Sequence, residues 1–356
     1  MILALDAHLP FNDEGADNMD TLLTFATDER TARIALAAIA EPGDATTGYL
    51  LMSHGAIDTT TMLSDDGPVP GLDNVEAQLW RKRLRTRIEP ELIREVIDRT
   101  TRDGFETLIP GDSGYPVSLD DLGDAAPYVL WVKGAKSLLT TSMSERFTIA
   151  GARAASSYGV HVANELASGL ASDEGVIVAG GAYGIDGAAH HSALSVGGHT
   201  IAVMPSGLDR LYPAGHRDLL ERVGDLGLLV SELPPGATPT RSRFIARARI
   251  EAALSGSTTI VEAGHRSGSL RVAEHARSLG RGVGAVPGPV TSAASAGPHR
   301  LLAEGIASVV TNANDVRAFS EKVPIEGPTQ QLDADVFGRD TRSVNSRDVR
   351  SVRREL

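Results

Sequence analysis

The chain has 356 residues, of which 42% are hydrophobic and 22% are charged, and it contains no cysteine. A chain of this length buries a full hydrophobic core without covalent cross-links, and the missing thiols exclude disulfides and cysteine-based zinc sites. The formal net charge of −12 excludes a protein that coats nucleic acid over its whole surface, because binding to phosphates needs clustered Lys and Arg. A DNA-binding function must therefore rest on a local basic surface.

The sequence lacks the features of a membrane or secreted protein. No apolar run approaches the roughly 18 residues needed to cross a bilayer. The first residues, MILALDAHLPFNDEGAD, are acidic and lack the charged and then apolar layout of a signal peptide. We therefore expect a cytoplasmic protein that does not contact a membrane.

The N-terminal part of the chain is predicted to be helical. Residues 1–20 hold five acidic residues and no Lys or Arg, which is typical of a disordered tail. Residues 21–101 carry Ala and Leu at helical spacing and are predicted to form a small helical domain. Its helices are expected over Asp28–Ile39, Val75–Arg87 and Pro90–Thr100.

Residues 104–318 are predicted to form a second domain of alternating strands and helices. Short apolar runs indicate strands at Thr148–Ala150, Val176–Ala179, Thr200–Met204, Leu228–Ser231, Thr258–Val261, Val283–Val286 and Ser308–Val310. Helices are expected near residues 157–172, 185–195, 214–223, 243–255, 268–279 and 297–304. Apolar strands separated by amphipathic helices are typical of a mostly parallel sheet covered on both faces. The sequence therefore predicts an α/β fold with an extended Rossmann-like, doubly wound sheet.

The C-terminal segment, residues 322–356, differs again in composition. It has few apolar residues, and its last 18 residues include six Arg. We expect a polar, Arg-containing tail without a core of its own.

Two glycine-containing turns follow the first two strands of the predicted sheet. Gly151 and Arg153 follow the first, and the Gly180–Gly184 loop follows the second. In a doubly wound sheet these loops line the ligand crevice, where backbone amides and Arg attract phosphate. We predict that Gly151, Arg153, Gly180, Gly181, Tyr183 and Gly184 bind DNA or phosphate. The alternative for Gly151 and Arg153 is a tight turn with a surface Arg.

Polar residues after the other strands extend this predicted site. Ser206 and Gly207 are expected at the crevice edge, and Ser267, Gly268 and Ser269 to offer donors to an anion. Three further residues are expected to give structural support. Asp186 and His190 are predicted to brace the glycine loop, and Glu262 to orient Arg247 or bind a ligand hydroxyl.

The densest basic patch in the predicted sheet domain lies on its fourth helix. Arg241, Arg243, Arg247 and Arg249 fall within nine residues that hold no acid. Arg243 and Arg247 are four residues apart and share a helix face. In a chain of net charge −12 this patch indicates a surface that follows the phosphates of a nucleic acid. The alternative is a solvated helix face.

Several motifs of catalytic and cofactor sites are missing. The sequence has no GxxxxGK[ST] phosphate loop, no HExxH, no GxSxG and no group of His, Asp and Glu at metal-ligand spacing. The glycine loop is not GxGxxG, which disfavours a nicotinamide or flavin cofactor. We therefore predict a protein that is not an enzyme and needs no cofactor and no metal.

Taken in order, the motifs resemble the bacterial DNA-processing protein A family, also called DprA or Smf. The matching segments are Tyr115–Pro116, Val129–Gly134, Gly151–Arg153, Gly180–His190, Gly207–Pro213, Ser231–Gly236, Phe244–Ser255, Val261–Leu270 and Val286–Gly288. The resemblance implies a single-stranded DNA-binding homodimer that protects incoming DNA and loads the recombinase RecA on it in natural transformation.

The resemblance also assigns roles to three arginines. Arg153 matches the phosphate-contacting Arg of the family, and Arg247 and Arg249 match the flanks of its usual Arg-Asn-Arg. Ala248 stands where that motif has Asn, and Tyr183 where many relatives carry a basic residue.

Two other kinds of function fit the same residues. In the first, a Rossmann-like domain binds or cleaves a small nucleotide derivative, with the glycine loop, Ser267–Ser269 and Glu262 around its phosphate and sugar. In the second, the chain is a scaffold that acts by dimerising and by contacting other proteins. Binding of oligonucleotides compared with mononucleotides distinguishes the first of these from a DNA-binding protein.

Overall fold

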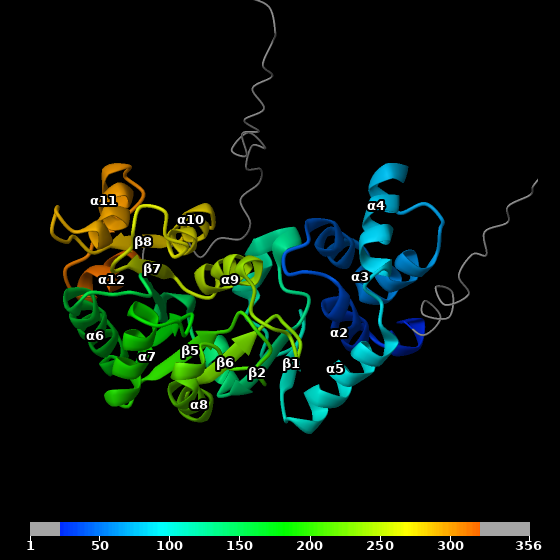
Figure 1. The fold of residues 1–356 in the computed structure, drawn as a ribbon, viewed down its shortest axis with the longest axis horizontal. Coiled ribbons are helices and arrows are strands. Elements are labelled where there is room, and N and C mark those ends of the chain that lie inside the picture. The colour runs from blue at the N-terminus through cyan, green and yellow to red at the C-terminus, as the bar shows by residue number, and fades with distance from the viewer. Residues whose placement is uncertain (1–21, 321–356) are drawn as a thin grey trace, which may run out of the picture. The chain divides into compact units, whose positions relative to one another are not determined.

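A computed structural model of the chain describes residues 22–320. The tails predicted at residues 1–20 and 322–356 lie outside the described residues. The described chain consists of a group of N-terminal helices followed by a nine-stranded sheet with helices on both faces (Figure 1). The predicted α/β fold with a mostly parallel sheet is confirmed.

Four N-terminal helices are α2 (Glu29–Ile39), α3 (Ala45–Ser64), α4 (Asn74–Arg85) and α5 (Pro90–Arg102). Three of them occupy the predicted positions, and Asp28 caps the first by accepting a hydrogen bond from the Thr31 amide. The sequence did not predict α3. Its helical pattern is broken at Gly55, where a φ of 78° kinks the helix.

These helices share a hydrophobic core with the sheet. The indole of Trp131, on strand β2 (Leu130–Gly134), is buried and donates a hydrogen bond of 3.0 Å to the Thr100 hydroxyl on α5. Arg33 on α2 donates to the backbone oxygen of Tyr128 at 3.0 Å. The helical and sheet segments belong to one compact unit, and their division into separate domains stays a prediction.

The sheet has the strand order β1-β2-β6-β5-β4-β3-β7-β8-β9. Besides β2, the strands are β1 (Glu106–Leu108), β3 (Arg146–Ala150), β4 (Val176–Ala179), β5 (His199–Val203), β6 (Leu228–Ser231), β7 (Ser257–Ile260), β8 (Gly282–Ala285) and β9 (Ser308–Val309). Strand β2 pairs antiparallel with β1 and β6, and all other neighbours are parallel. The seven predicted strands form the parallel part.

Alternating strand residues face two layers of helices. One face packs against α6 (Ser157–Ser172), α7 (Ile185–Ser195), α8 (Arg217–Leu226) and α12 (Ala313–Ser320). The other packs against α9 (Arg241–Ala253), α10 (Leu270–Ser278) and α11 (Ala296–Ala303). In Figure 1, α9 and α10 lie on the opposite side of the sheet from α7 and α8. Along β3, Phe147 and Ile149 pack into the first layer and Ala150 into the second.

The strand order reverses beside β3. The chain runs from β3 through β4 and β5 to β6, and then returns to place β7 on the other side of β3. The loops that leave the carboxyl ends of β3 and β7 therefore turn in opposite directions. Ligands of doubly wound sheets bind in the crevice at this topological switch point.

Candidate nucleic-acid interface

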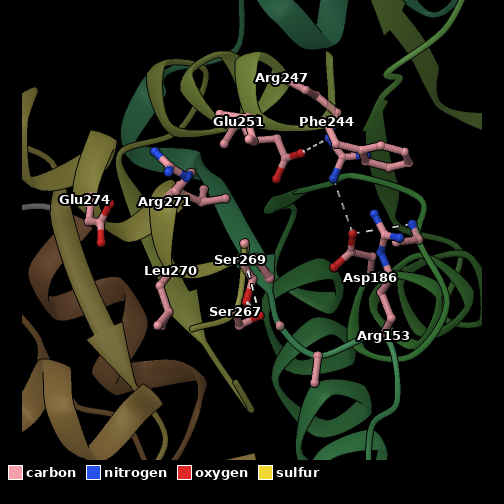
Figure 2. Close-up of a pocket in the computed structure, with 18 of the residues that line it drawn as sticks. Arg153, Asp186, Phe244, Arg247, Glu251, Ser267, Ser269, Leu270, Arg271 and Glu274 are labelled. Atoms are coloured by element: carbon pink, nitrogen blue, oxygen red, sulfur yellow. Dashed lines mark hydrogen bonds and ion pairs between the residues drawn. The ribbon is translucent and has the colours of Figure 1, made fainter. Parts of the chain in front are cut away.

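A pocket of about 780 Å³ opens at the switch point. Its walls are the loop after β3, the loop after β7, helix α9 and the first turn of α10 (Figure 2). We call it the switch-point pocket. Its volume lies within the range of small-ligand sites, so it has room for a nucleotide unit.

The structure brings together part of the predicted site. Eight of the predicted residues line the pocket: Gly151, Arg153, Asp186, Arg241, Arg247, Ser267, Gly268 and Ser269. The other ten lie outside its lining: Gly180, Gly181, Tyr183, Gly184, His190, Ser206, Gly207, Arg243, Arg249 and Glu262.

Arg153 is an exposed cation at the edge of the pocket. Its guanidinium carbon lies 4.4 Å from the centroid of the Phe244 ring, which orients the side chain by a cation–π contact. Within residues 22–320 the guanidinium forms no ion pair and no side-chain hydrogen bond. Arg153 therefore keeps its donors available for a phosphate.

Three further arginines of the pocket are exposed and unpaired. Among the described residues, Arg241, Arg266 and Arg271 make no side-chain hydrogen bond or ion pair. Sequence reasoning found only the first, because it looked for basic residues on one helix. Arg266 directly precedes the Ser267–Ser269 turn, and Arg271 lies in the first turn of α10. Their closeness to the predicted anion-binding turn could have identified both residues from the sequence.

Arg247 lies inside the pocket wall and is paired. Its Nε lies 2.5 Å from Glu251 Oε1, and its Nη2 lies 3.8 Å from Asp186 Oδ2. Its Nη1 also donates to the Gly180 oxygen at 2.6 Å. Figure 2 shows Glu251 and Asp186 reaching the pocket from α9 and α7 on either side of this guanidinium. We call Asp186, Arg247 and Glu251 the buried ion cluster.

Burial perturbs the carboxyl groups of the buried ion cluster. It raises the pKa of Glu251 to about 7, with the charge of Asp186 adding to this effect and the charge of Arg247 opposing it. Burial also raises the pKa of Asp186, and Arg247 opposes the change. The carboxyl groups of Asp186 and Glu251 therefore bind a proton at a higher pH than ordinary carboxyl groups do.

The prediction of an exposed patch that includes Arg243 and Arg249 is wrong. Arg249 is buried, and its two terminal nitrogens lie 2.6 Å and 2.5 Å from the Glu232 carboxylate. The Arg243 side chain is mostly buried and pairs with Glu41 at 3.3 Å. A guanidinium that is already bound to carboxylates inside the protein is not available to DNA phosphates.

The glycines of the loop after β4 allow close packing of the protein and do not open the loop to a ligand. Gly180 is buried, and a methyl group there would lie 2.0 Å from Arg247 Nη2. Gly181 is also buried. Gly184 has a φ of 77°, and a methyl group would lie 2.2 Å from the Ala152 oxygen. These glycines let the loops after β3 and β4 approach each other and Arg247, and they do not form the expected open anion site.

Ser206 and Gly207 were predicted at the crevice edge but are buried. The Ser206 hydroxyl donates to the Arg210 oxygen at 2.8 Å, and its own backbone oxygen accepts from the Ser231 hydroxyl. A methyl group at Gly207 would lie 2.5 Å from the Pro234 oxygen. These two residues hold the loops after β5 and β6 together.

Glu262 does not orient Arg247, contrary to expectation. Its carboxylate accepts hydrogen bonds from the Ser156 amide at 2.8 Å and from the Ser156 hydroxyl at 2.6 Å. Because Ser156 is the residue that caps α6, the amino-terminal end of that helix already holds a protein carboxylate. In dinucleotide-binding folds a pyrophosphate occupies the corresponding position.

The turn before α10 retains one free amide. The Ser267 amide donates to the Gly264 oxygen, and the Ser269 amide to the Ser267 hydroxyl. The Gly268 amide has no acceptor in the described part of the protein, and open space surrounds this glycine. The turn therefore offers an anion fewer backbone donors than the sequence suggested.

His190 and Tyr183 do not line the switch-point pocket and are held by contacts within the protein. His190 Nδ1 shares a hydrogen bond of 2.7 Å with the Thr200 hydroxyl. Burial lowers the pKa of His190 to about 3, and the charges of His216 and Arg247 contribute. The Tyr183 hydroxyl accepts from the Gly215 amide at 3.2 Å, and its ring packs edge-on against His216. These contacts are structural ones.

The described residues contain neither a metal-binding cluster nor a membrane-spanning helix. No group of three or more His, Asp or Glu side chains between residues 22 and 320 is arranged to hold a metal ion. Over the same residues, no helix combines the length and the apolar character that a membrane crossing requires.

Comparison with known proteins confirms the family resemblance. Residues 106–321 match the family model of DNA recombination-mediator protein A. A DprA protein of Mycobacterium tuberculosis is 43% identical over 267 residues, which cover 71% of this chain and 68% of that protein. The DNA processing protein DprA of Streptococcus pneumoniae is 42% identical over 210 residues, which cover 59% of this chain and 72% of that protein.

Two solved structures share the fold. The crystal structure of DprA from Streptococcus pneumoniae matches with a TM-score of 0.66 and 31% identity, over 82% of this chain and 97% of that one. A structure of DNA processing protein A from Helicobacter pylori, which addresses its single-stranded DNA binding mode, matches with a TM-score of 0.55 and 29% identity. That match covers 62% of this chain and 97% of that one.

The matched family consists of DNA-processing proteins and is not a known enzyme family, in agreement with the prediction. The family model covers more than half of the chain. The chain therefore belongs to the DNA recombination-mediator protein A family.

Proposed function

We propose that the chain binds single-stranded DNA at the switch-point pocket. The observation that carries this proposal is the group of unpaired, exposed guanidiniums of Arg153, Arg241, Arg266 and Arg271 around one pocket of an acidic protein. A flexible polyanion binds such a surface through its phosphates and releases counterions as it does so.

The shape of the pocket favours a single strand over a duplex. Its volume of about 780 Å³ is lined by these arginines and lies between α9, α10 and the loops after β3 and β7. A base can enter a recess of this kind only when it is neither paired nor stacked. The Helicobacter pylori relative, whose binding mode for single-stranded DNA has been described, supports the same reading.

The proposal extends to the role of the bound strand. As a recombination mediator, the chain would protect incoming single-stranded DNA, load RecA on it during natural transformation, and act in the cytoplasm as a homodimer. The description of the matched family as recombination mediators supports this extension.

A second function is favoured by the pocket volume, which also suits a small nucleotide derivative. Titrations that compare a 20-nucleotide strand, the same sequence as a duplex, and deoxynucleoside monophosphates separate the two. We expect the single strand to bind at least about 100-fold more tightly than a monophosphate, because several phosphates engage several arginines. A monophosphate that binds as tightly as the strand, or a duplex that binds better than the strand, contradicts the proposal.

A further inference from the structure

The charges around the switch-point pocket are arranged in two levels. The unpaired arginines, among them Arg153 and Arg271, are exposed. The carboxylates of Asp186 and Glu251 are 5% and 1% exposed, yet both line the pocket. Apart from Glu274, the charged residues exposed around the pocket are therefore cationic, and the buried wall holds two acids and one cation, Arg247. A phosphate is attracted by the first level and repelled by the second, so a phosphate alone does not explain the inner part.

Glu251 is only partly satisfied by its protein partner. Its Oε1 lies 2.5 Å from Arg247 Nε, whereas no side chain or amide of the described residues donates a hydrogen bond to its Oε2. Arg247 is shared among three acceptors, because it also reaches Asp186 and the Gly180 oxygen. An ionised carboxylate accepts hydrogen bonds at two oxygens and donates none. The Glu251 carboxylate in the pocket wall can therefore accept a further hydrogen bond from an N–H group of a ligand.

We propose that Glu251 selects the base that enters the switch-point pocket, accepting a hydrogen bond from an exocyclic amino group and disfavouring thymine. This inference rests on the proposed binding of single-stranded DNA in that pocket. Cytosine, adenine and guanine each carry an amino group, whereas thymine presents two carbonyl oxygens on either side of its one N–H. Those oxygens would face a carboxylate that has no proton to donate. A site built to accept a hydrogen bond from an amino group discriminates against a base that lacks this group.

The chain offers a matched control for the charge of Glu251. Glu274 also lines the pocket, but its side chain is 52% exposed and its partner is Arg300 at 3.6 Å. Glu251→Gln and Glu274→Gln each remove one negative charge from the pocket with almost no change in shape. Only the first alters the buried wall, so only the first should change the choice between bases.

The test compares strands of equal length and equal phosphate charge. Binding of dC20 and dT20 to the full chain is measured at pH 8.5, where Glu251, whose pKa burial raises to about 7, is ionised. We expect dC20 to bind about tenfold more tightly, the size of one hydrogen bond to a charged acceptor. A dC20 strand with both amino hydrogens replaced by methyl groups should lose this advantage with the protein unchanged. Glu251→Gln should lower the ratio to about one, and Glu274→Gln should leave it intact.

The results of this experiment distinguish a failure of the inference about Glu251 from a failure of the proposed single-stranded DNA binding. If neither strand binds, the proposed function fails and the inference fails with it. If both strands bind equally to the wild-type chain, or if Glu251→Gln keeps the wild-type ratio while still binding dT20, the inference alone is overturned. Because dT20 binding and a melting curve report the folded state of each variant, a misfolded variant cannot imitate the expected result.

Discussion

Single arginines in this chain differ in whether they are paired inside the protein. Arg153 and Arg271 are exposed and, within the described residues, make no ion pair. Arg249 is buried and held by both oxygens of Glu232. The first kind can give its donors to a ligand, and the second contributes to the fold. Arginines that are close together in the sequence can belong to either kind, because the burial of each side chain determines whether it is paired inside the protein.

Replacing Arg249 should therefore lower the stability of the fold, because this residue does not contact the DNA directly. Arg249→Ala leaves the Glu232 carboxylate buried without its partner, which should lower the free energy of unfolding by about 3–5 kcal/mol. Arg153→Ala removes an exposed side chain and should change that free energy by less than about 1 kcal/mol. Urea denaturation of both variants checks this. Similar destabilisation by both changes would contradict the assignment.

Two buried titratable residues should give opposite pH dependences. The pKa of Glu251 is raised from 4.5 to about 7, so between these values the folded chain keeps a proton that the unfolded chain has lost. Its contribution to the free energy of unfolding therefore falls as the pH rises. The pKa of His190 is lowered from 6.5 to about 3, so between these values only the unfolded chain binds the proton. Its contribution is lost as the pH falls.

Each residue should contribute a slope of up to about 1.4 kcal/mol per pH unit within its window. Glu251→Gln should therefore gain stability relative to the wild type as the pH rises from 4.5 to 7. His190→Asn should gain relative to the wild type as the pH falls from 6.5 toward 3. Denaturation curves at several pH values measure both differences. A difference that does not vary with pH in either variant would show that the buried group is not titrating as proposed.

At the scale of elements, the two helix starts near the switch point differ in what they offer an anion. The amino-terminal end of α6 already holds the Glu262 carboxylate through Ser156. The turn before α10 keeps the Gly268 amide free and exposed within the described structure. A phosphate in this pocket therefore has a backbone donor at α10 and not at α6.

A pair of glycine substitutions tests whether DNA approaches that turn. Neither Gly268 nor Gly264 has a left-handed φ, and a methyl group at either would meet no protein atom within 4 Å. Both alanine variants should keep the wild-type stability. Gly268→Ala should weaken single-strand binding about three- to tenfold by blocking close approach of the ligand, and Gly264→Ala, which does not line the pocket, should not. Equal affinities of the two variants would argue against a phosphate at this turn.

For the whole molecule, the sequence was informative where burial imposes a pattern. The parallel strands β3 to β8 lie within one or two residues of their predicted positions, because strands covered on both faces need continuous apolar runs. Strands β1 and β2 were missed because they pair antiparallel and stand outside the alternation of parallel strands and helices on which the prediction rested. Helix α3 was missed because Gly55 interrupts its pattern.

The site was predictable only in part. The switch-point position, Arg153 and the Ser267–Ser269 turn follow from the order of strands and loops. The pairing of Arg247 with Glu251 could have been recognised, since residues four apart share a helix face. The pairing of Arg249 with Glu232 depends on contacts between distant segments and was not visible in the sequence.

The most direct test of the account is the salt dependence of single-strand binding in two arginine variants. Arg153 belongs to the switch-point pocket, whereas Arg222 is exposed on α8, on the other face of the sheet. Arg153→Ala should weaken binding and reduce the slope of log affinity against log salt by about 0.7, the value for one phosphate contact. Arg222→Ala should change neither. An unchanged slope in Arg153→Ala, or an equal loss in both variants, would contradict binding of DNA at this pocket.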